Sequence, residues 1–109
     1  MADKPWKQFE RDAAALFSGT RYPANLGGRV DFRGAHVRGQ CKLVKTLSLE
    51  ALTQLVEEMD AHTKETFDAG VVCVKVRRGS GRSSPPLVVF SFEGFLKLLH
   101  YYGIRKETL

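Results

Sequence analysis

Three residues near the middle of the chain have side chains suited to metal or phosphate chemistry: Asp31, Gln40 and Lys42. Asp31 is the only acid between Arg21 and Lys45, a stretch that is otherwise rich in Lys and Arg. A carboxylate and an amide offer oxygen ligands to a divalent cation, and a lysine stabilises negative charge on a phosphate. The pattern D-x8-Q-x-K is short, so its meaning depends on the elements that position these side chains.

Two runs of alternating character, residues 29–33 and 36–44, predict a β-hairpin that turns at Gly34-Ala35. Side chains alternate across a strand, so one face of the second run is apolar and belongs to the core. The other face carries the polar residues His36, Arg38, Gln40 and Lys42.

The turn decides which residue lies opposite Asp31. A turn at Gly34-Ala35 places Asp31 opposite Arg38, and a four-residue turn places it opposite Gln40. Both registers collect Asp31, Gln40 and Lys42 on one surface. The alternative interpretations are a surface ion pair for Asp31 and a solvated strand position for Lys42.

A fourth candidate, Glu10, lies within the apolar stripe of a helix predicted for residues 5–18. Residues at helical spacing after Pro5 form that stripe: Trp6, Phe9, Ala13, Leu16 and Phe17. A carboxylate there is costly without a partner, and a divalent cation shared with Asp31 would compensate it. Two carboxylates with an amide or a main-chain carbonyl suit Mg²⁺ or Mn²⁺. The alternative for Glu10 is a boundary acid that reaches solvent.

The rest of the chain predicts a helix at residues 49–65 with Ser48 as its N-cap, strands at 70–76 and 87–92, and a C-terminal helix. The predicted order is α-β-β-α-β-β-α. This is a central mixed β-sheet flanked by helices, in the α/β or α+β class. A Gly/Ser-rich loop joins the last two strands.

Length and composition indicate one soluble domain. The chain has 109 residues, of which 43% are hydrophobic and 27% are charged, and no apolar run is long enough to span a membrane. The segment "MADKPWKQFERD" lacks the apolar core of a secretory signal, so a cytoplasmic location is expected. Cys41 and Cys73 lie in predicted strands and fit no metal spacing, so we interpret them as buried thiols.

The net charge of +5 is distributed unevenly, with basic residues gathered around the predicted hairpin and acids gathered between Glu50 and Asp68. The hairpin end of the molecule is therefore expected to bind a polyanion. The expected contacts with DNA phosphates are Arg21, Arg29, Arg33, Arg38 and Lys45, with Arg78 and Arg82 of the Gly/Ser loop as a second group. The alternatives are a solvated basic face and an ordinary exposed loop.

Together, Glu10, Asp31 and Gln40-Cys41-Lys42 resemble the active-site pattern of the PD-(D/E)xK nuclease superfamily. The chain is similar to archaeal-type Holliday-junction resolvases and to small phage-encoded nucleases. The similarity extends through "LSLEALTQLVEEMDA", "GVVCVKVRRG" and "LVVFSFEGFLKLL". It implies a single restriction-endonuclease-like nuclease domain over residues 1–109.

The resemblance also implies roles for the candidate residues. Asp31 would be the principal Mg²⁺ ligand, with Gln40, the Cys41 carbonyl and Glu10 completing the site. Lys42 would orient or help deprotonate the attacking water. Arg11 matches a basic position that follows the helix acid in the family, so it is also expected to contact DNA.

Two positions depart from the family pattern. Gln40 replaces the usual glutamate, which removes a negative charge from the site, and Val30 replaces the usual proline before the aspartate.

The predicted function is therefore a metal-dependent, structure-selective DNA endonuclease. Its partners would be branched or duplex DNA and a second copy of the chain, because resolving a four-way junction needs two symmetric nicks. One rival interpretation is a binding module of the same fold with weak or no catalysis. Another is an inert subunit of a larger recombination complex.

Overall fold

In a computed structural model of the chain, residues 4–22, 30–79, 82 and 84–103 are described. They form three helices and five strands, in the order α1 (Pro5–Leu16), β1 (Thr20–Arg21), β2 (Phe32–Gly34), β3 (Val37–Val44), α2 (Leu49–Thr63), β4 (Ala69–Val76), β5 (Leu87–Val89) and α3 (Phe92–Tyr101). The predicted mixed class with a central mixed sheet is confirmed.

The predicted element order is wrong, because the chain has the order α-β-β-β-α-β-β-α. The missed element is β1, whose two residues pair with Phe32 and Arg33 of β2. A strand of two residues is too short to show an alternating pattern, so it can be recognised only from its pairing.

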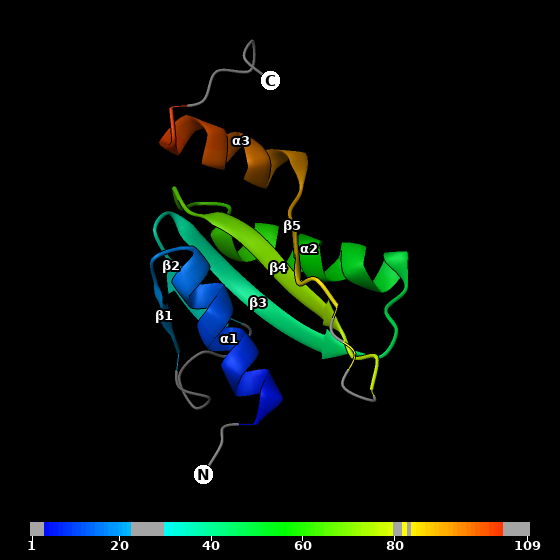
Figure 1. Cartoon of the computed structure of the whole chain (residues 1–109). Helices are drawn as coiled ribbons and strands as arrows, with labels where there is room; N and C mark the ends of the chain where they lie inside the picture. Colours follow the sequence, from blue (N-terminus) through cyan, green and yellow to red (C-terminus); the bar gives the residue numbers. More distant parts are fainter. Residues whose placement is uncertain (1–3, 23–29, 80–81, 83, 104–109) are drawn as a thin grey trace.

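The strands form one sheet in the order β1-β2-β3-β4-β5. β3 and β4 pair in parallel along their whole length, and all the other neighbouring strands are antiparallel. α2 makes the crossover between the two parallel strands, which a hairpin cannot do. Figure 1 shows α1 crossing in front of β3 while α2 lies behind the sheet.

Each face of the sheet has its own core. On one face, Phe9 and Ala13 of α1 and Leu98 of α3 pack with strand residues such as Phe32 and Val71. On the other face, Met59 of α2 packs with Val30, Val72 and Val74. The sheet is therefore covered by α1 and α3 on one side and by α2 on the other.

The predicted helix signals are largely confirmed. Pro5 stands at the start of α1, and the Ser48 hydroxyl accepts a hydrogen bond from the Ala51 amide at 3.1 Å, which caps α2. The last predicted strand is too long, because Ser91 caps α3 by accepting from the Gly94 amide at 3.1 Å. The chain therefore leaves the sheet after Val89.

The hairpin contains an irregularity at Asp31. The register pairs Phe32 with Gly39 and Arg33 with Arg38, so the expectation that Asp31 lies opposite Arg38 is wrong. The Asp31 amide also donates to the Gly39 carbonyl at 2.8 Å. Two residues of one strand thus oppose one residue of the other, which is a β-bulge.

The bulge changes the direction of the neighbouring side chains. Residues two apart on a regular strand share a face, yet Val30 and Phe32 lie in the cores on opposite sides of the sheet. Asp31 is the residue between them. Gly39 permits the arrangement, because a Cβ at that position would lie 2.1 Å from the ring of Phe32.

In the part of the chain that the structure describes, no helix is long and apolar enough to cross a bilayer.

Candidate active site

Glu10 is buried on α1, as predicted, and its partner is an arginine. The Glu10 residue is 8% exposed, and its Oε1 accepts a hydrogen bond from Arg21 Nε at 2.6 Å. β1 places Arg21 opposite Phe32, whose ring belongs to the core beneath α1. The buried carboxylate therefore has the compensating charge that the sequence required, supplied within the chain.

Asp31 is held at three atoms. Its amide donates to Gly39, its carbonyl accepts from the Tyr22 amide at 2.8 Å, and its Oδ2 accepts from the Cys41 amide at 2.8 Å. The carboxylate is thereby fixed against the backbone of β3, between Gln40 and Lys42.

Glu10 and Asp31 interact with each other. Burial raises the pKa of Glu10, and the nearby charge of Asp31 raises it further against the opposing effect of Arg21. Burial also raises the pKa of Asp31, and the Cys41 amide and the charge of Lys42 partly offset this. Two carboxyl groups from separate elements are thus brought together in a partly desolvated place, where a cation would stabilise their charged forms.

The side chains of Gln40 and Lys42 lie on the face of the sheet opposite to Glu10. Their parallel partners are Val72 and Val74, which pack beneath α2. Asp31 lies between Glu10 and Arg21 on one side and Lys42 on the other, and its pKa is affected by all three residues. Asp31 thus meets Glu10 and the backbone of β3, while the side chains of Gln40 and Lys42 lie on the opposite face of that strand, so the predicted residues do not share one flat surface.

The donor atoms fit a hard divalent cation. Gln40 is 9% exposed, and among the described residues its buried Oε1 has no hydrogen-bond partner. A buried oxygen without a partner costs free energy, which coordination of a cation would recover. The carbonyl of Cys41 points to the same strand edge as its amide, toward Asp31. Two carboxylates, an amide and a carbonyl are suitable oxygen ligands for Mg²⁺ or Mn²⁺.

Over residues 4–22, 30–79, 82 and 84–103, no three His, Cys, Asp or Glu side chains are grouped so that they could hold a metal ion. A site that contains two carboxylates, an amide and a main-chain carbonyl differs from such a group. It resembles a magnesium site more than a zinc site.

The two cysteines are free thiols, as predicted, and lie opposite each other on β3 and β4. Their mutual hydrogen bond and burial raise the pKa of Cys41. Cys41 therefore stays protonated at neutral pH and is a poor nucleophile. Its contribution to the candidate site is the main chain.

A partner that the sequence analysis missed is Asp68, just before β4. Its Oδ2 accepts from Arg38 Nε at 2.8 Å and lies 3.7 Å from Arg33 Nη2. Both arginines were predicted to contact DNA, and here both are paired within the chain. The parallel register of β3 and β4 brings Asp68 to them, so no local pattern could reveal the contact.

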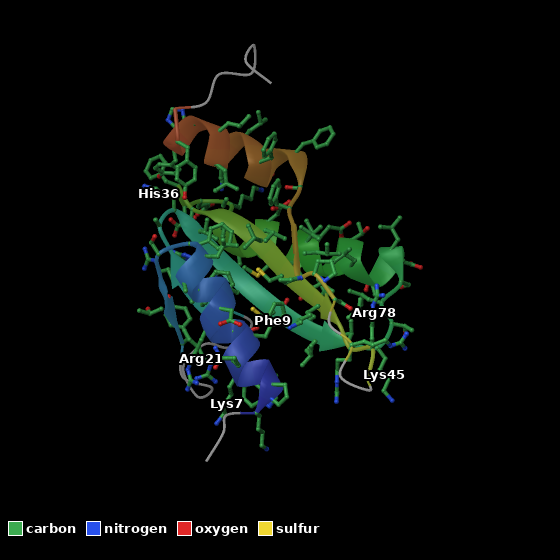
Figure 2. All side chains as sticks on the ribbon, viewed as in Figure 1. Lys7, Phe9, Arg21, His36, Lys45 and Arg78 are labelled. Carbon is green, nitrogen blue, oxygen red and sulfur yellow. The ribbon has the colours of Figure 1, made fainter. Side chains whose placement is uncertain are left out.

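Other predicted DNA contacts lie on the surface. Arg11, Lys45, Arg78 and Arg82 are exposed. Figure 2 places Lys45 and Arg78 close together at the C-terminal end of β3 and β4, with Arg21 and Lys7 near the start of α1 and His36 at the opposite end of the molecule. Arg29 lies outside the described residues.

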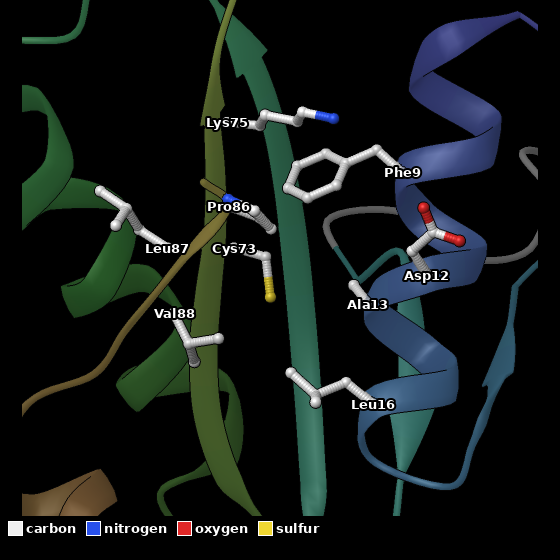
Figure 3. A pocket seen from close by; sticks show the side chains of 9 residues that line it. All are labelled: Phe9, Asp12, Ala13, Leu16, Cys73, Lys75, Pro86, Leu87 and Val88. Carbon is white, nitrogen blue, oxygen red and sulfur yellow. The ribbon is translucent and has the colours of Figure 1, made fainter. Parts of the chain in front are cut away.

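A pocket between α1 and β5 plays no part in this cluster. Figure 3 shows its wall, which is mainly apolar and includes Phe9, Leu16, Leu87 and Val88. It shares no residue with the candidate site.

When the chain is compared with protein-family models, with curated proteins and with solved structures, nothing matches. The residues and their geometry are therefore the basis for a functional proposal.

Proposed function

We propose that the chain is a metal-dependent, structure-selective DNA endonuclease with a restriction-endonuclease-like domain. The observation that carries this proposal is the meeting of the Glu10 and Asp31 carboxylates at the backbone of Cys41. The preceding residue on β3, Gln40, has a buried Oε1 with no hydrogen-bond partner among the described residues. This set matches the acid, acid-or-amide and lysine pattern of the PD-(D/E)xK nucleases.

The proposed reaction is hydrolysis of a phosphodiester bond. Glu10, Asp31, Gln40 Oε1 and the Cys41 carbonyl would hold Mg²⁺, or Mn²⁺ in its place. When bound, this ion supplies a Lewis acid for the phosphate and lowers the pKa of a water molecule. Lys42 orients the attacking water and stabilises the charge that develops on the phosphate. The Cys41 amide fixes the Asp31 carboxylate, so that it needs little rearrangement.

The DNA substrate is recognised by shape. Lys45, Arg78 and Arg82 are exposed cations suited to backbone phosphates, and they carry no information about base sequence. A four-way junction presents such phosphates in a branched arrangement. Branched or duplex DNA is therefore the proposed substrate class.

We further propose that two copies act together, because a junction is resolved by two symmetric nicks. The C-terminal helix supplies apolar residues for the contact: Phe92 and Leu96 are 90% and 44% exposed. Light scattering at micromolar concentration should give the mass of a dimer. A monomer that makes only uncoupled nicks would contradict the resolvase type and leave a simpler nickase.

One observation favours a second candidate, a nucleic-acid-binding module without catalysis. Gln40 contributes no charge, and Glu10 is already neutralised by Arg21, so the site attracts a cation less strongly than three carboxylates would.

One cleavage and binding experiment separates the nuclease from the binding module. Labelled four-way junction, duplex and single strand are incubated with the protein in Mg²⁺, Mn²⁺ or EDTA. A nuclease cuts the junction only with a metal ion, whereas a binding module shifts the DNA in a gel and leaves it intact under all three conditions.

A further inference from the structure

Two cations compete for the Glu10 carboxylate. It is a proposed ligand of the divalent cation, and its Oε1 already accepts from Arg21 Nε at 2.6 Å. The side chains of Arg21 and Glu10 are only 18% and 11% exposed, so water screens the pair weakly. A guanidinium and a divalent cation repel each other at this distance, so the two compete for the Glu10 carboxylate. Binding the ion therefore disfavours the contact between Arg21 and Glu10.

The neighbouring tryptophan contacts the guanidinium while it is bound to Glu10. Arg21 Cζ lies 5.6 Å from the centroid of the Trp6 ring. Trp6 precedes Glu10 by one turn of α1, so both side chains are on one face of the helix. Attraction between a cation and an indole ring would keep the guanidinium beside the site after it leaves the carboxylate.

We propose that Arg21 is a resident counter-cation of Glu10 that the divalent ion displaces, and that the displaced guanidinium then binds a DNA phosphate beside Trp6. This inference rests on the proposed nuclease function, because it concerns the same site. Arg21 would then set the metal affinity of the site, in addition to contacting a DNA phosphate.

The exchange keeps the site close to charge balance. Without the ion, Arg21 neutralises one of two carboxylates that lie close together. With the ion bound, a guanidinium left at Oε1 would add excess positive charge, whereas beside Trp6 it can meet the negative charge of the substrate. The apparent metal affinity is then reduced by the population in which Arg21 occupies Glu10.

The test follows Mg²⁺ binding by calorimetry and by the fluorescence of Trp6, which is the only tryptophan in the chain. In the wild type, the fluorescence should change over the same Mg²⁺ range as the heat of binding, because the guanidinium moves on the indole ring. In Arg21→Gln, Mg²⁺ should bind about tenfold more tightly, and the fluorescence should no longer respond. Lys7→Gln is the matched control, since Lys7 Nζ lies 5.5 Å from the same ring but the salt bridge to Glu10 belongs to Arg21; it should bind Mg²⁺ like the wild type.

The outcomes distinguish this inference from the proposed function. Suppose that the wild type binds Mg²⁺ and cleaves the junction, but Arg21→Gln binds Mg²⁺ no more tightly than the wild type. This result overturns the displacement and leaves the proposed function standing. If neither the wild type nor Arg21→Gln binds Mg²⁺, the metal-dependent nuclease and the displacement fall together. If Arg21→Gln does not fold, Arg21→Lys decides: an ammonium lacks the rigid fork of a guanidinium, so Mg²⁺ affinity should rise about threefold, and unchanged affinity overturns the inference.

Discussion

Two charged clusters in the molecule, one at Asp68 and one at the candidate site, contain carboxylates and arginines in opposite proportions. At Asp68, one carboxylate accepts from Arg38 at 2.8 Å and has Arg33 at 3.7 Å. At the candidate site, two carboxylates lie together, and one arginine, Arg21, is hydrogen-bonded to Glu10. The first cluster can serve as a structural joint between β3 and β4. The second has raised carboxyl pKa values even with Lys42 nearby, which is typical of a functional site.

The largest effect is expected from Lys42 in the proposed active site. Lys42→Ala should slow junction cleavage by about a hundredfold or more, the scale of losing one group that stabilises a transition state. Binding of the junction should remain, because Lys42 acts on the reaction more than on ground-state binding. Rates from labelled junctions and affinities from gel shifts measure the two effects. Lys75→Ala, on the strand beside β3, is the control, and wild-type cleavage by Lys42→Ala would refute the assignment.

The second prediction compares how much each of the two clusters contributes to the free energy of unfolding. Asp68→Asn should lower the free energy of unfolding by about 2 kcal/mol, because it weakens the charge-assisted bond to the partly buried Arg38. Asp31→Asn should cause no loss, since the amide oxygen can still accept from Cys41 and the repulsion with Glu10 disappears. Urea unfolding without metal ions compares them. Equal losses in both variants would remove the distinction between a structural and a functional cluster.

A third prediction concerns the amide in the site. Gln40→Glu should raise Mg²⁺ affinity by about tenfold, which is 1.4 kcal/mol of binding free energy, because a carboxylate is a stronger ligand for a hard cation. Gln54→Glu on the exposed face of α2 is the matched control and should leave the affinity unchanged. Calorimetry measures both. A folded Gln40→Glu protein with weaker Mg²⁺ binding would show that residue 40 is not a ligand.

The raised pKa values predict a pH dependence of stability. A carboxyl group with a raised pKa in the folded state binds its proton more tightly there than in the unfolded chain, so stability falls as the pH rises. The fall begins at the unfolded values of about 4 and ends above the raised folded values. Asp31→Asn should therefore gain stability relative to the wild type as the pH rises through this window. Asp12→Asn, on the exposed side of α1, is the control and should show no such gain in stability. If the difference in unfolding free energy between Asp31→Asn and the wild type stays constant with pH, the predicted link between Asp31 and stability is wrong.

The smallest effect is expected from the exposed cations. Lys45→Gln should weaken junction binding slightly and reduce the salt dependence of the affinity by about one ion. Arg38→Gln should instead lower stability, because Arg38 is held by Asp68. Gel shifts across a salt series, with urea unfolding beside them, measure the pair. If Lys45→Gln leaves the salt dependence unchanged, Lys45 is not a phosphate contact.

Much of the fold could be predicted from the sequence because its signals are local. Pro5 and the apolar spacing after it predict α1, and Ser48 predicts the start of α2. The run of β-branched residues in β4 predicts a buried strand. β1 could not be predicted, since a two-residue strand exists only through its pairing with β2.

For the candidate site, the sequence indicates candidate residues but not the contacts that they make. Glu10 in an apolar stripe signals a need for positive charge, but nothing local identifies Arg21 as its source. The alternation of β3 predicts the direction of Gln40 and Lys42, whereas the bulge at Asp31 breaks the alternation that the prediction assumed. Asp68 likewise depends on the register between β3 and β4. Contacts between distant segments, which decide these points, leave no periodic pattern in the sequence.

The central claim is that Glu10 and Asp31 form the binding site of a divalent cation. Its most direct test is the free energy of unfolding in a Mg²⁺ series, for the wild type and for the double variant Glu10→Gln/Asp31→Asn. Ligand linkage predicts that the wild type gains about 2.7 kcal/mol at one hundred times the dissociation constant, while the double variant gains nothing. A wild type that does not respond to Mg²⁺, or a double variant that responds equally, would contradict the account.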